Sequence, residues 1–281
     1  MNSNSHGIGL IVALQNRYGL KDQSLPNPLK IIDFSHTIFD TPVSFKRFIF
    51  PNTADFESAT FSRLAYFKSA TFSAQINFIN SEFTSKTIFA NANFNNVPDF
   101  RGAKMHEATE WHGIAWPSVP IDKENAQDQV YKYEHLKQEM ERLKKHEDEQ
   151  FFFRKELRVR RKLMPLWSVA RFLNYLYEAL SDYGQSTNKP LLWLCGSFLL
   201  GGAGFAWSFN NAGTSWTILH AASLSFASIF PFFPFYKETI NPDVFASLSS
   251  LAKIIVVMAS FFGTLLLFLL GLALRNRFRM R

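Results

Sequence analysis

The chain has 281 residues, of which 47% are hydrophobic and 16% aromatic, and it carries a formal net charge of +7. Its single cysteine, Cys195, excludes a disulfide framework and a cysteine metal cluster within one chain. Many of the Lys and Arg residues that make up the positive charge lie beside two long apolar segments near the C-terminus. This position favours a role in setting membrane orientation over a nucleic-acid-binding surface.

The first thirty residues are predicted to form an N-terminal cap. Apolar side chains stand at Ile8, Leu10, Ile11, Val12 and Leu14. The segment is too short and lacks the basic start of a secretory signal, so we predict no cleaved targeting peptide. A repeat region follows, and the ends of repeat arrays need capping.

Residues 31–117 contain a regular series of large apolar side chains, alternately five and six residues apart. The members are Phe34, Phe39, Phe45, Phe50, Phe56, Phe61, Phe67, Phe72, Phe78, Phe83, Phe89, Phe94, Phe100, Met105, Trp111 and Trp116. Neither an amphipathic helix nor a two-faced strand has this period. The series therefore predicts a solenoid.

Small residues often stand two positions before each large one, as Ala54, Ala59 and Ala65 do, and polar residues fill the gaps. This pattern resembles the pentapeptide-repeat family, in its phenylalanine-rich form. The resemblance implies a right-handed quadrilateral β-helix of about four coils, with the rings stacked along its axis.

Residues 118–188 form a charged linker domain. Val130, Tyr133, Leu136, Met140 and Leu143 fall at helical spacing, and a second helix is expected over residues 147–163. These two helices predict a helical hairpin on the cytoplasmic side.

A third amphipathic segment follows Pro165, with an apolar stripe at Leu166, Val169, Leu173, Leu176 and Leu180. It fits an interfacial helix that surrounds a pore. A third helix packed on the hairpin is the alternative.

Residues 189–281 are predicted to form a two-span membrane domain. Residues 190–209 and 251–274 are long, nearly continuous apolar runs. Basic residues precede the first run and follow the second, so both termini are expected in the cytoplasm, at a bacterial inner membrane. Lipid headgroups are the expected partners of Arg158, Arg160, Arg161, Arg275 and Arg277.

Residues 214–236 are apolar too, but a third crossing would move the C-terminal arginines to the other side. We therefore expect a re-entrant loop, with a helix over residues 215–229 that ends in extended backbone at Pro231 and Pro234. Non-helical backbone at membrane depth is tolerated when it is buried in protein or lines a water path.

The order of span, loop and span resembles the two-transmembrane pore-loop channels of the potassium-channel superfamily. The run GLALRNRFR at residues 271–279 and the run SDYG at residues 181–184 are similar to those of bacterial pentapeptide-repeat proteins that end in such a module. The resemblance implies a homotetramer.

The loop departs from a potassium filter because it has neither glycine nor carboxylate. The residues predicted to form the pore constriction are Ser228, Ile229, Phe230, Pro231, Phe232, Phe233 and Pro234. Ser260 and Thr264 are candidates to line the pore, and Gly263 and Gly271 to act as hinges. The alternative is a loop that only packs as a plug. The residue types do not identify a permeant ion.

Enzymatic motifs are absent from the sequence, and we predict no catalytic residues, no metal and no cofactor. His146 and Glu147 begin a zinc-helix motif, but Gln150 stands where its second histidine belongs. DNA mimicry is disfavoured because charges nearly cancel over the repeat, and no nucleic-acid partner is expected. The sequence thus predicts an ion channel whose β-helix gates or assembles it and offers a surface for a ligand or protein; the alternative is a non-conducting, membrane-anchored scaffold.

Overall fold

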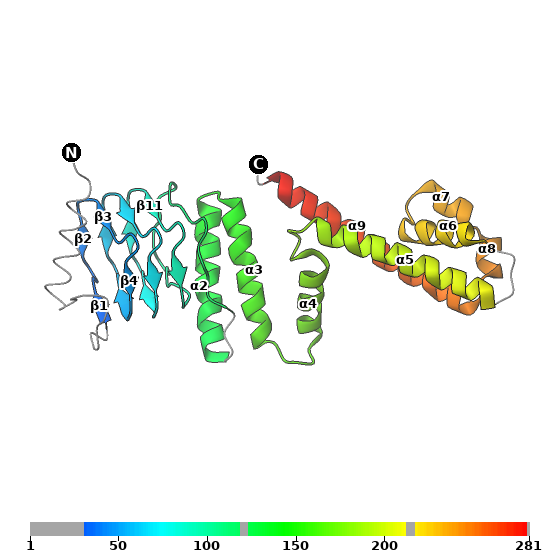
Figure 1. Cartoon of the computed structure of the whole chain (residues 1–281), viewed down its shortest axis with the longest axis horizontal. Coiled ribbons are helices and arrows are strands. Elements are labelled where there is room, and N and C mark those ends of the chain that lie inside the picture. The colour runs from blue at the N-terminus through cyan, green and yellow to red at the C-terminus, as the bar shows by residue number, and fades with distance from the viewer. Residues whose placement is uncertain (1–30, 119–122, 212–216, 280–281) are drawn as a thin grey trace. The chain divides into compact units, whose positions relative to one another are not determined.

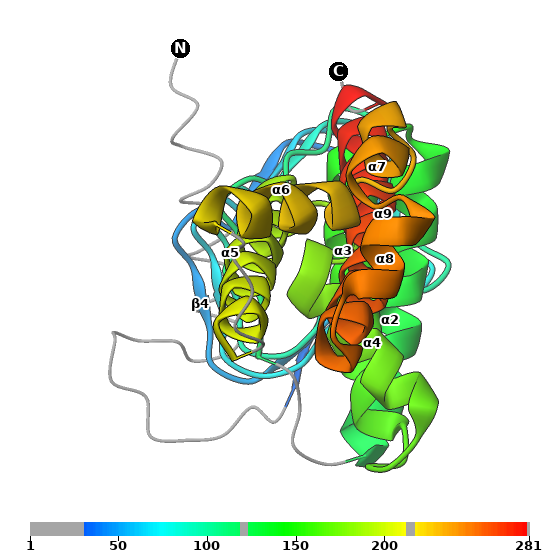
Figure 2. The ribbon, with the colours of Figure 1, turned by 90° about the vertical axis from the view of Figure 1, so that its right-hand side faces the viewer.

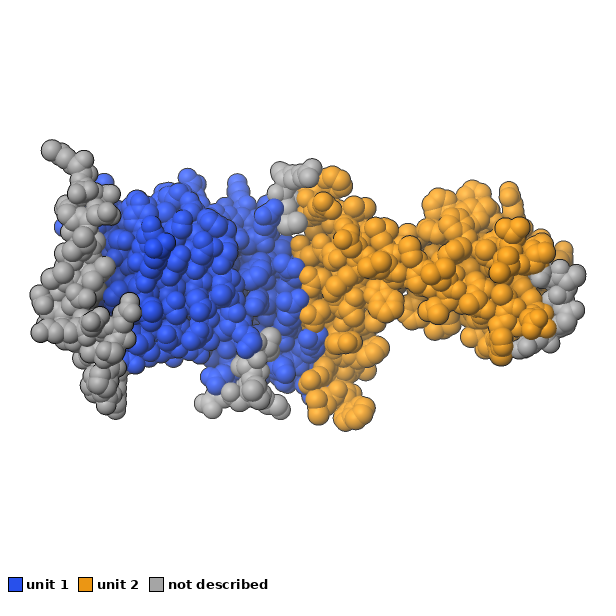
Figure 3. All heavy atoms as spheres, viewed as in Figure 1, with its two compact units in different colours: residues 1–165 blue, residues 166–281 orange. Residues whose placement is uncertain are grey.

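The computed structural model describes residues 31–118, 123–211 and 217–279. The chain divides into two compact units, Met1–Pro165 and Leu166–Arg281, which Figure 3 colours separately. The cap predicted over residues 1–30 lies outside the described residues.

The described part of the first unit begins with twelve short parallel strands stacked in four three-stranded sheets, which makes a β-helix (Figure 1). In spatial order the sheets are β1 (Ile31–Asp33), β5 (Thr53–Asp55), β9 (Ile76–Asn77); β2 (Ile38–Phe39), β6 (Thr60–Phe61), β10 (Glu82–Phe83); β3 (Val43–Ser44), β7 (Ala65–Tyr66), β11 (Thr87–Ile88); and β4 (Ile49–Phe50), β8 (Thr71–Phe72), β12 (Asn93–Phe94).

Each coil contains 22 residues, because that separation pairs every strand with the next one in its sheet. Phe61 pairs with Phe39 on one side and with Phe83 on the other. Two five-residue and two six-residue steps make one such coil, so the predicted spacing is confirmed. Isolated bridges, such as the one between Asn93 and Ala115, continue the pattern through the last coil.

The aromatic side chains form four columns inside the β-helix. The columns are Phe34, Phe56, Phe78, Phe100; Phe39, Phe61, Phe83; Phe45, Phe67, Phe89, Trp111; and Phe50, Phe72, Phe94, Trp116. The ring centroids of Phe61 and Phe83 lie 4.8 Å apart, which equals the spacing of neighbouring strands. Each buried ring contributes about 1.5–3 kcal/mol.

A turn follows every second aromatic residue. The N–H group of Ala59 donates to the carbonyl of Phe56 at 3.1 Å, and Ser58 between them has a φ of 54°. A positive φ at the third position is typical of a type II turn. The same conformation recurs every eleven residues, at His36, Arg47, Ser58, Ser69, Asn80, Asn91, Gly102 and Gly113.

A helical hairpin closes the C-terminal end of the β-helix. Its helices, α2 (Lys123–Arg142) and α3 (His146–Leu163), confirm the predicted pair. Phe152 of α3 packs against Trp111 and Trp116 of the last coil, with centroids 6.3 and 5.0 Å away. One hydrophobic core therefore runs from the first coil into the hairpin.

Hairpin side chains also bond the open backbone edge of the last coil. Glu139 Oε1 accepts the N–H of Met105 at 2.9 Å, and Arg142 Nη2 donates to the Met105 carbonyl at 3.0 Å. Lys145 donates to the carbonyl of Thr109. An uncovered strand edge invites pairing with another chain, so these bonds make the hairpin a cap.

The second unit is helical. Its helices are α4 (Val169–Ser181), α5 (Asn188–Asn211), α6 (Ile218–Ile229), α7 (Pro234–Thr239), α8 (Pro242–Ser247) and α9 (Ser250–Arg279). By length and composition, α5 and α9 could each cross a membrane, with mean hydropathies of 1.4 and 2.6. Only 22% of the most apolar stretch of each helix is buried within the chain, so most of this apolar surface is open.

The region between the spans differs from the expected extended loop. The backbone is extended at Phe233, as predicted before a proline. Pro234, however, begins α7, and Pro242 begins α8. Proline suits the first helical position because its fixed φ is helical and no N–H bond is lost there.

Candidate functional site

The predicted pore segment is α6 and the turn that follows it, held against both long helices. Figure 2 shows α6 crossing between α5 and α9, and α6 contacts each of them. Ala221, Leu224, Ser225, Ala227 and Ser228 are buried, whereas Ile218 and Leu219 at the start of α6 are exposed. The buried face is rich in small residues, which let helices approach closely.

A polar contact joins α6 to α5. The Ser225 hydroxyl donates to the backbone carbonyl of Phe198 at 2.8 Å. Gly201 makes room for it, since a Cβ there would lie 2.5 Å from Ser225 Oγ. Ser225 is a polar residue on an apolar helix, and these contacts give it a role in helix packing.

The two hinge candidates lie in different surroundings. A Cβ on Gly263 would lie 2.2 Å from the carbonyl oxygen of Ile229, at the end of α6. A Cβ on Gly271 would meet no atom within 4 Å. Close packing therefore explains Gly263, while nothing in the described part of this unit requires glycine at position 271.

Ser260 and Thr264, the predicted pore-lining residues on α9, also differ from each other in their hydrogen bonds. The Thr264 hydroxyl donates to the Ser260 carbonyl of its own helix at 2.8 Å. The Ser260 hydroxyl oxygen is shielded from solvent and has no partner among the described residues. On α6, the Ser228 hydroxyl likewise donates to its own helix, at the Leu224 carbonyl, 2.7 Å away.

Aromatic rings gather around the turn after α6. Phe230 lies 4.8 Å from Phe226 and 5.8 Å from Phe233, between ring centroids, and Phe235 stacks on Phe226 at 5.3 Å. Phe232 stands apart with 73% of its surface exposed. The predicted constriction thus contributes two rings, Phe230 and Phe233, to a packed cluster and has one outward phenylalanine, Phe232.

The expected headgroup-binding arginines fall in both units. Arg160 of α3 bonds Glu156 at 2.6 Å and lies 3.3 Å from Glu134, so it is engaged within the hairpin. Arg275 and Arg277 are both exposed near the end of α9. Of these three arginines, the two on α9 are the better placed for a headgroup.

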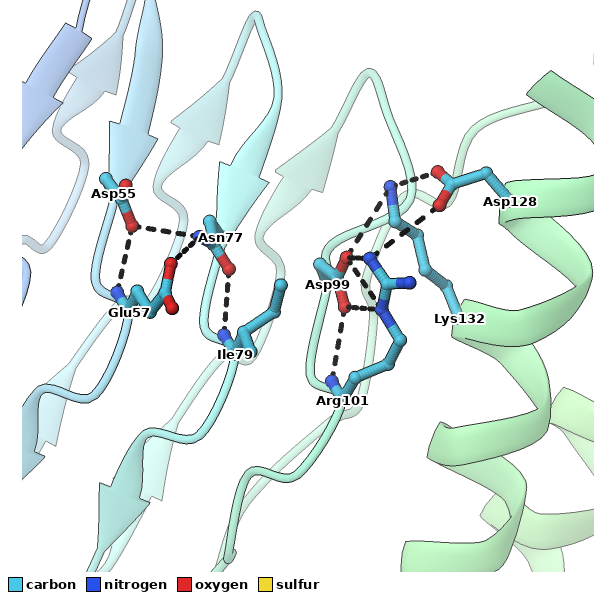
Figure 4. A network of polar contacts seen from close by, with 8 residues as sticks. All are labelled: Asp55, Glu57, Asn77, Ile79, Asp99, Arg101, Asp128 and Lys132. Atoms are coloured by element: carbon cyan, nitrogen blue, oxygen red, sulfur yellow. Dashed lines mark hydrogen bonds and ion pairs between the residues drawn. The ribbon is translucent and has the colours of Figure 1, made fainter. Parts of the chain in front are cut away.

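The β-helix carries a ladder of polar side chains along one corner (Figure 4). Asp55 accepts the N–H of Glu57 at 2.9 Å, and Asn77 one coil on accepts that of Ile79 at 2.8 Å. The Asn77 amide also donates to Asp55 Oδ1 at 3.0 Å. The Asn77 amide thus lies between the carboxylate of Asp55 and that of Asp99 on the next coil, and it bonds Asp55.

The ladder ends on the hairpin. Asp99 is 1% exposed and is held by Arg101 and by Lys132 of α2, whose ammonium also lies 2.5 Å from Asp128. Bonding to Asp99 raises the pKa of the Arg101 guanidinium. The chain itself therefore engages the last carboxylate of the ladder.

The SDYG run at residues 181–184 forms a tight corner between α4 and α5. Asp182, Tyr183 and Gly184 all have positive φ, at 49°, 58° and 77°. Tyr183 is buried and its hydroxyl donates to Asn174 of α4 at 3.0 Å. Asn276 of α9 donates to the Gly184 carbonyl at 3.0 Å, which joins the corner to the far end of the chain.

Comparison with known proteins gives no assignment. No protein-family model, curated protein or solved structure matches this chain. Among the described residues, no group of three or more His, Cys, Asp or Glu side chains is placed to hold a metal ion.

Proposed function

We propose that this protein is an ion channel of a bacterial inner membrane, built from a pentapeptide-repeat β-helix and a two-span pore module. The observation that carries the proposal is α6. It is an apolar helix of 12 residues, about 18 Å long, against a hydrocarbon core of about 30 Å. A helix too short to cross, yet packed on two helices that are long enough, fits a re-entrant pore helix.

Charge supports the same topology. Arg275 and Arg277 lie at the end of α9, and Lys189 stands at the start of α5. With both flanks in the cytoplasm, the connection through α6, α7 and α8 enters and leaves on the opposite side. Both termini are then cytoplasmic, and the β-helix is a cytoplasmic domain.

In this proposal four subunits surround the pore. The segment from Ser228 to Pro234 forms the outer constriction, α9 lines the path, and Phe232 points toward the permeant ion. A narrow ring of phenylalanines conducts only when it is wetted, so it acts as a hydrophobic gate. No filter chemistry selects potassium, and the permeant ion is left to measurement.

Planar-bilayer recording of the purified full-length protein tests conduction. We expect discrete currents, a larger conductance in Phe232→Ala because the constriction widens, and reversal potentials that name the ion. Leu219→Ala, an exposed side chain at the other end of α6, is the matched control and should conduct as the parent does. Silence in all three proteins under varied voltage, tension and salt would contradict a pore.

A second candidate function is a non-conducting scaffold anchored by α5 and α9. The ring cluster of Phe226, Phe230, Phe233 and Phe235 favours it, because packed rings can close the loop as a plug. The recordings above separate the two candidates. Capture of a protein partner by the β-helix of a silent protein would support the scaffold.

A deletion that tests regulation by the β-helix must not leave part of the hydrophobic core exposed in the remaining protein. Removing the repeats alone would expose Phe152 and the rest of the capping face of the hairpin. The whole unit up to Pro165 is therefore the segment to delete. Currents with altered open probability are expected, and unchanged gating would contradict a regulatory role.

A further inference from the structure

The helix α4 carries a continuous apolar stripe along one side. Val169, Phe172, Leu173, Leu176 and Leu180 follow one another at intervals of one, three or four residues, which places them on one helical face. Ser168 begins the helix by accepting the N–H of Arg171 at 3.2 Å. The stripe therefore runs the full length of a well-formed helix.

Only the C-terminal half of this stripe is covered. Leu180 is buried, and Leu176 packs with it in a cluster that includes residues of α5 and α9. Val169, Phe172 and Leu173 are 72%, 63% and 55% exposed. The face that packs on the two long helices thus continues past them without cover.

The direction of α4 relative to α5 and α9 is set by bonds at their junction. Lys189 Nζ donates to the Glu178 carbonyl at 3.0 Å, and Trp193 Nε1 donates to the Ala179 carbonyl at 3.3 Å. Asn276 holds Gly184 from α9. Figure 1 shows that α4 runs across the direction of α5 and α9 rather than along it.

We propose that the outer part of α4, residues 166–173, is a membrane-interface anchor whose occupant is the lipid bilayer around α5 and α9. The inference rests on the part of the proposed function that places these two helices across a bilayer. A helix that runs across two spanning helices lies along the membrane plane. The face directed at the spans is then also the face directed at the surrounding hydrocarbon.

Neighbouring side chains match a lipid interface. Trp167 is 98% exposed and Tyr175 is 61% exposed, and these two residue types collect at the level of the headgroups. Arg171 stands on the side of the helix away from the stripe, where a headgroup phosphate would meet it. Bulky side chains without glycine favour lipid over a closely packed second copy of the chain.

Site-specific fluorescence tests the anchor in the full-length protein. Phe172→Cys and Leu173→Cys are made in a Cys195→Ser background, labelled with NBD and reconstituted in phosphatidylcholine vesicles. We expect blue-shifted emission that brominated acyl chains quench and aqueous iodide does not. Arg171→Cys is the control: it lies about 200° around the helix from Val169, on the side away from the stripe, and should show water-like emission that iodide quenches.

The native Cys195, exposed on α5, provides the reference for the spans. If its NBD label lies in hydrocarbon while the labels at positions 172 and 173 are water-exposed, the anchor is wrong and the spans stand. If the Cys195 label is water-exposed as well, the membrane assignment itself fails. Labels at 172 and 173 that neither quencher reaches would show a protein surface covering the stripe, which also overturns the lipid anchor.

Discussion

Gly263 of α9 and Ile229 of α6 touch so closely that no side chain fits between them. A Cβ at position 263 would lie 2.2 Å from the Ile229 carbonyl oxygen and 2.8 Å from its Cα. Both neighbouring atoms belong to the backbone, so neither can rotate away. This contact fixes where the end of α6 rests on α9.

Gly263→Ala should therefore separate α6 from α9. Overpacking of this kind costs about 1–3 kcal/mol. Thermal unfolding in detergent is the measurement. Gly271→Ala is the matched control: it meets no atom and should stabilise α9 by about 0.5–1 kcal/mol, since alanine is the better helix former. Equal effects of the two substitutions would contradict the packing described for Gly263.

Phe152→Ala should uncouple the hairpin from the β-helix. The ring is 1% exposed and packs on Trp111 and Trp116. Loss of a buried phenylalanine costs about 3–5 kcal/mol. Denaturant unfolding of the first unit measures it, and Phe153→Ala, next to it and only partly buried, should cost much less. A similar loss from both would argue against a specific cap.

Turn geometry makes a prediction at Gly102. Its φ of 70° lies in the left-handed region, and its Cβ would meet the Asn80 side chain at 2.2 Å. Gly102→Val should lower the free energy of unfolding by at least about 1–2 kcal/mol. Gly102→Asn should cost little, because asparagine adopts this conformation at Asn80 and Asn91. An equally destabilised Gly102→Asn variant would show that space, rather than backbone strain, decides.

Acid should weaken the β-helix. Lys86 Nζ lies 2.5 Å from Glu110 Oε1, and this bond holds the pKa of Glu110 below its usual value. The bond to Ser35 does the same for the pKa of Asp33. A lowered folded-state pKa gives stability above the unfolded-state pKa, which is about 4, and that stability is lost as the pH falls through the folded-state value.

The denaturant concentration at the unfolding midpoint should consequently fall once the pH is below about 4.5. Glu110→Gln should flatten part of that dependence, and Lys86→Met should flatten the same part. Denaturant titrations at several pH values measure both. If the double variant with Glu110→Gln and Lys86→Met flattens the pH dependence of stability twice as far as either single variant, the two groups are not acting as one pair.

Residue spacing predicted much of the fold because spacing is what the β-helix uses. Every member of the aromatic series from Phe34 to Trp116 lies in the interior or at its last coil. The runs at residues 190–209 and 251–274 fall within α5 and α9. Both patterns reflect burial or hydrocarbon length, which depend on residue type alone.

Other features depend on contacts between distant residues. Glu139 and Arg142 look like an ordinary surface pair in sequence, yet Glu139 bonds Met105, 34 positions earlier. Arg47 and Ser58 give no hint of positive φ, because the paired coils impose it. At the candidate pore, Gly263 and Gly271 read alike, and only the packing of α6 distinguishes them.

One coil holds 22 residues, but the turns and the alternating five- and six-residue steps repeat every eleven, so this β-helix can change length in half coils. Inserting 22 residues would lengthen the stack by one strand spacing, about 4.8 Å, and keep every column in register. Inserting eleven residues before Met105 would add half a coil, keep the order of turns and steps, and turn the hairpin by half a revolution relative to the first coil, while Glu139 and Arg142 keep their bonds to Met105. A duplication or deletion that survives in this protein should therefore count in multiples of eleven.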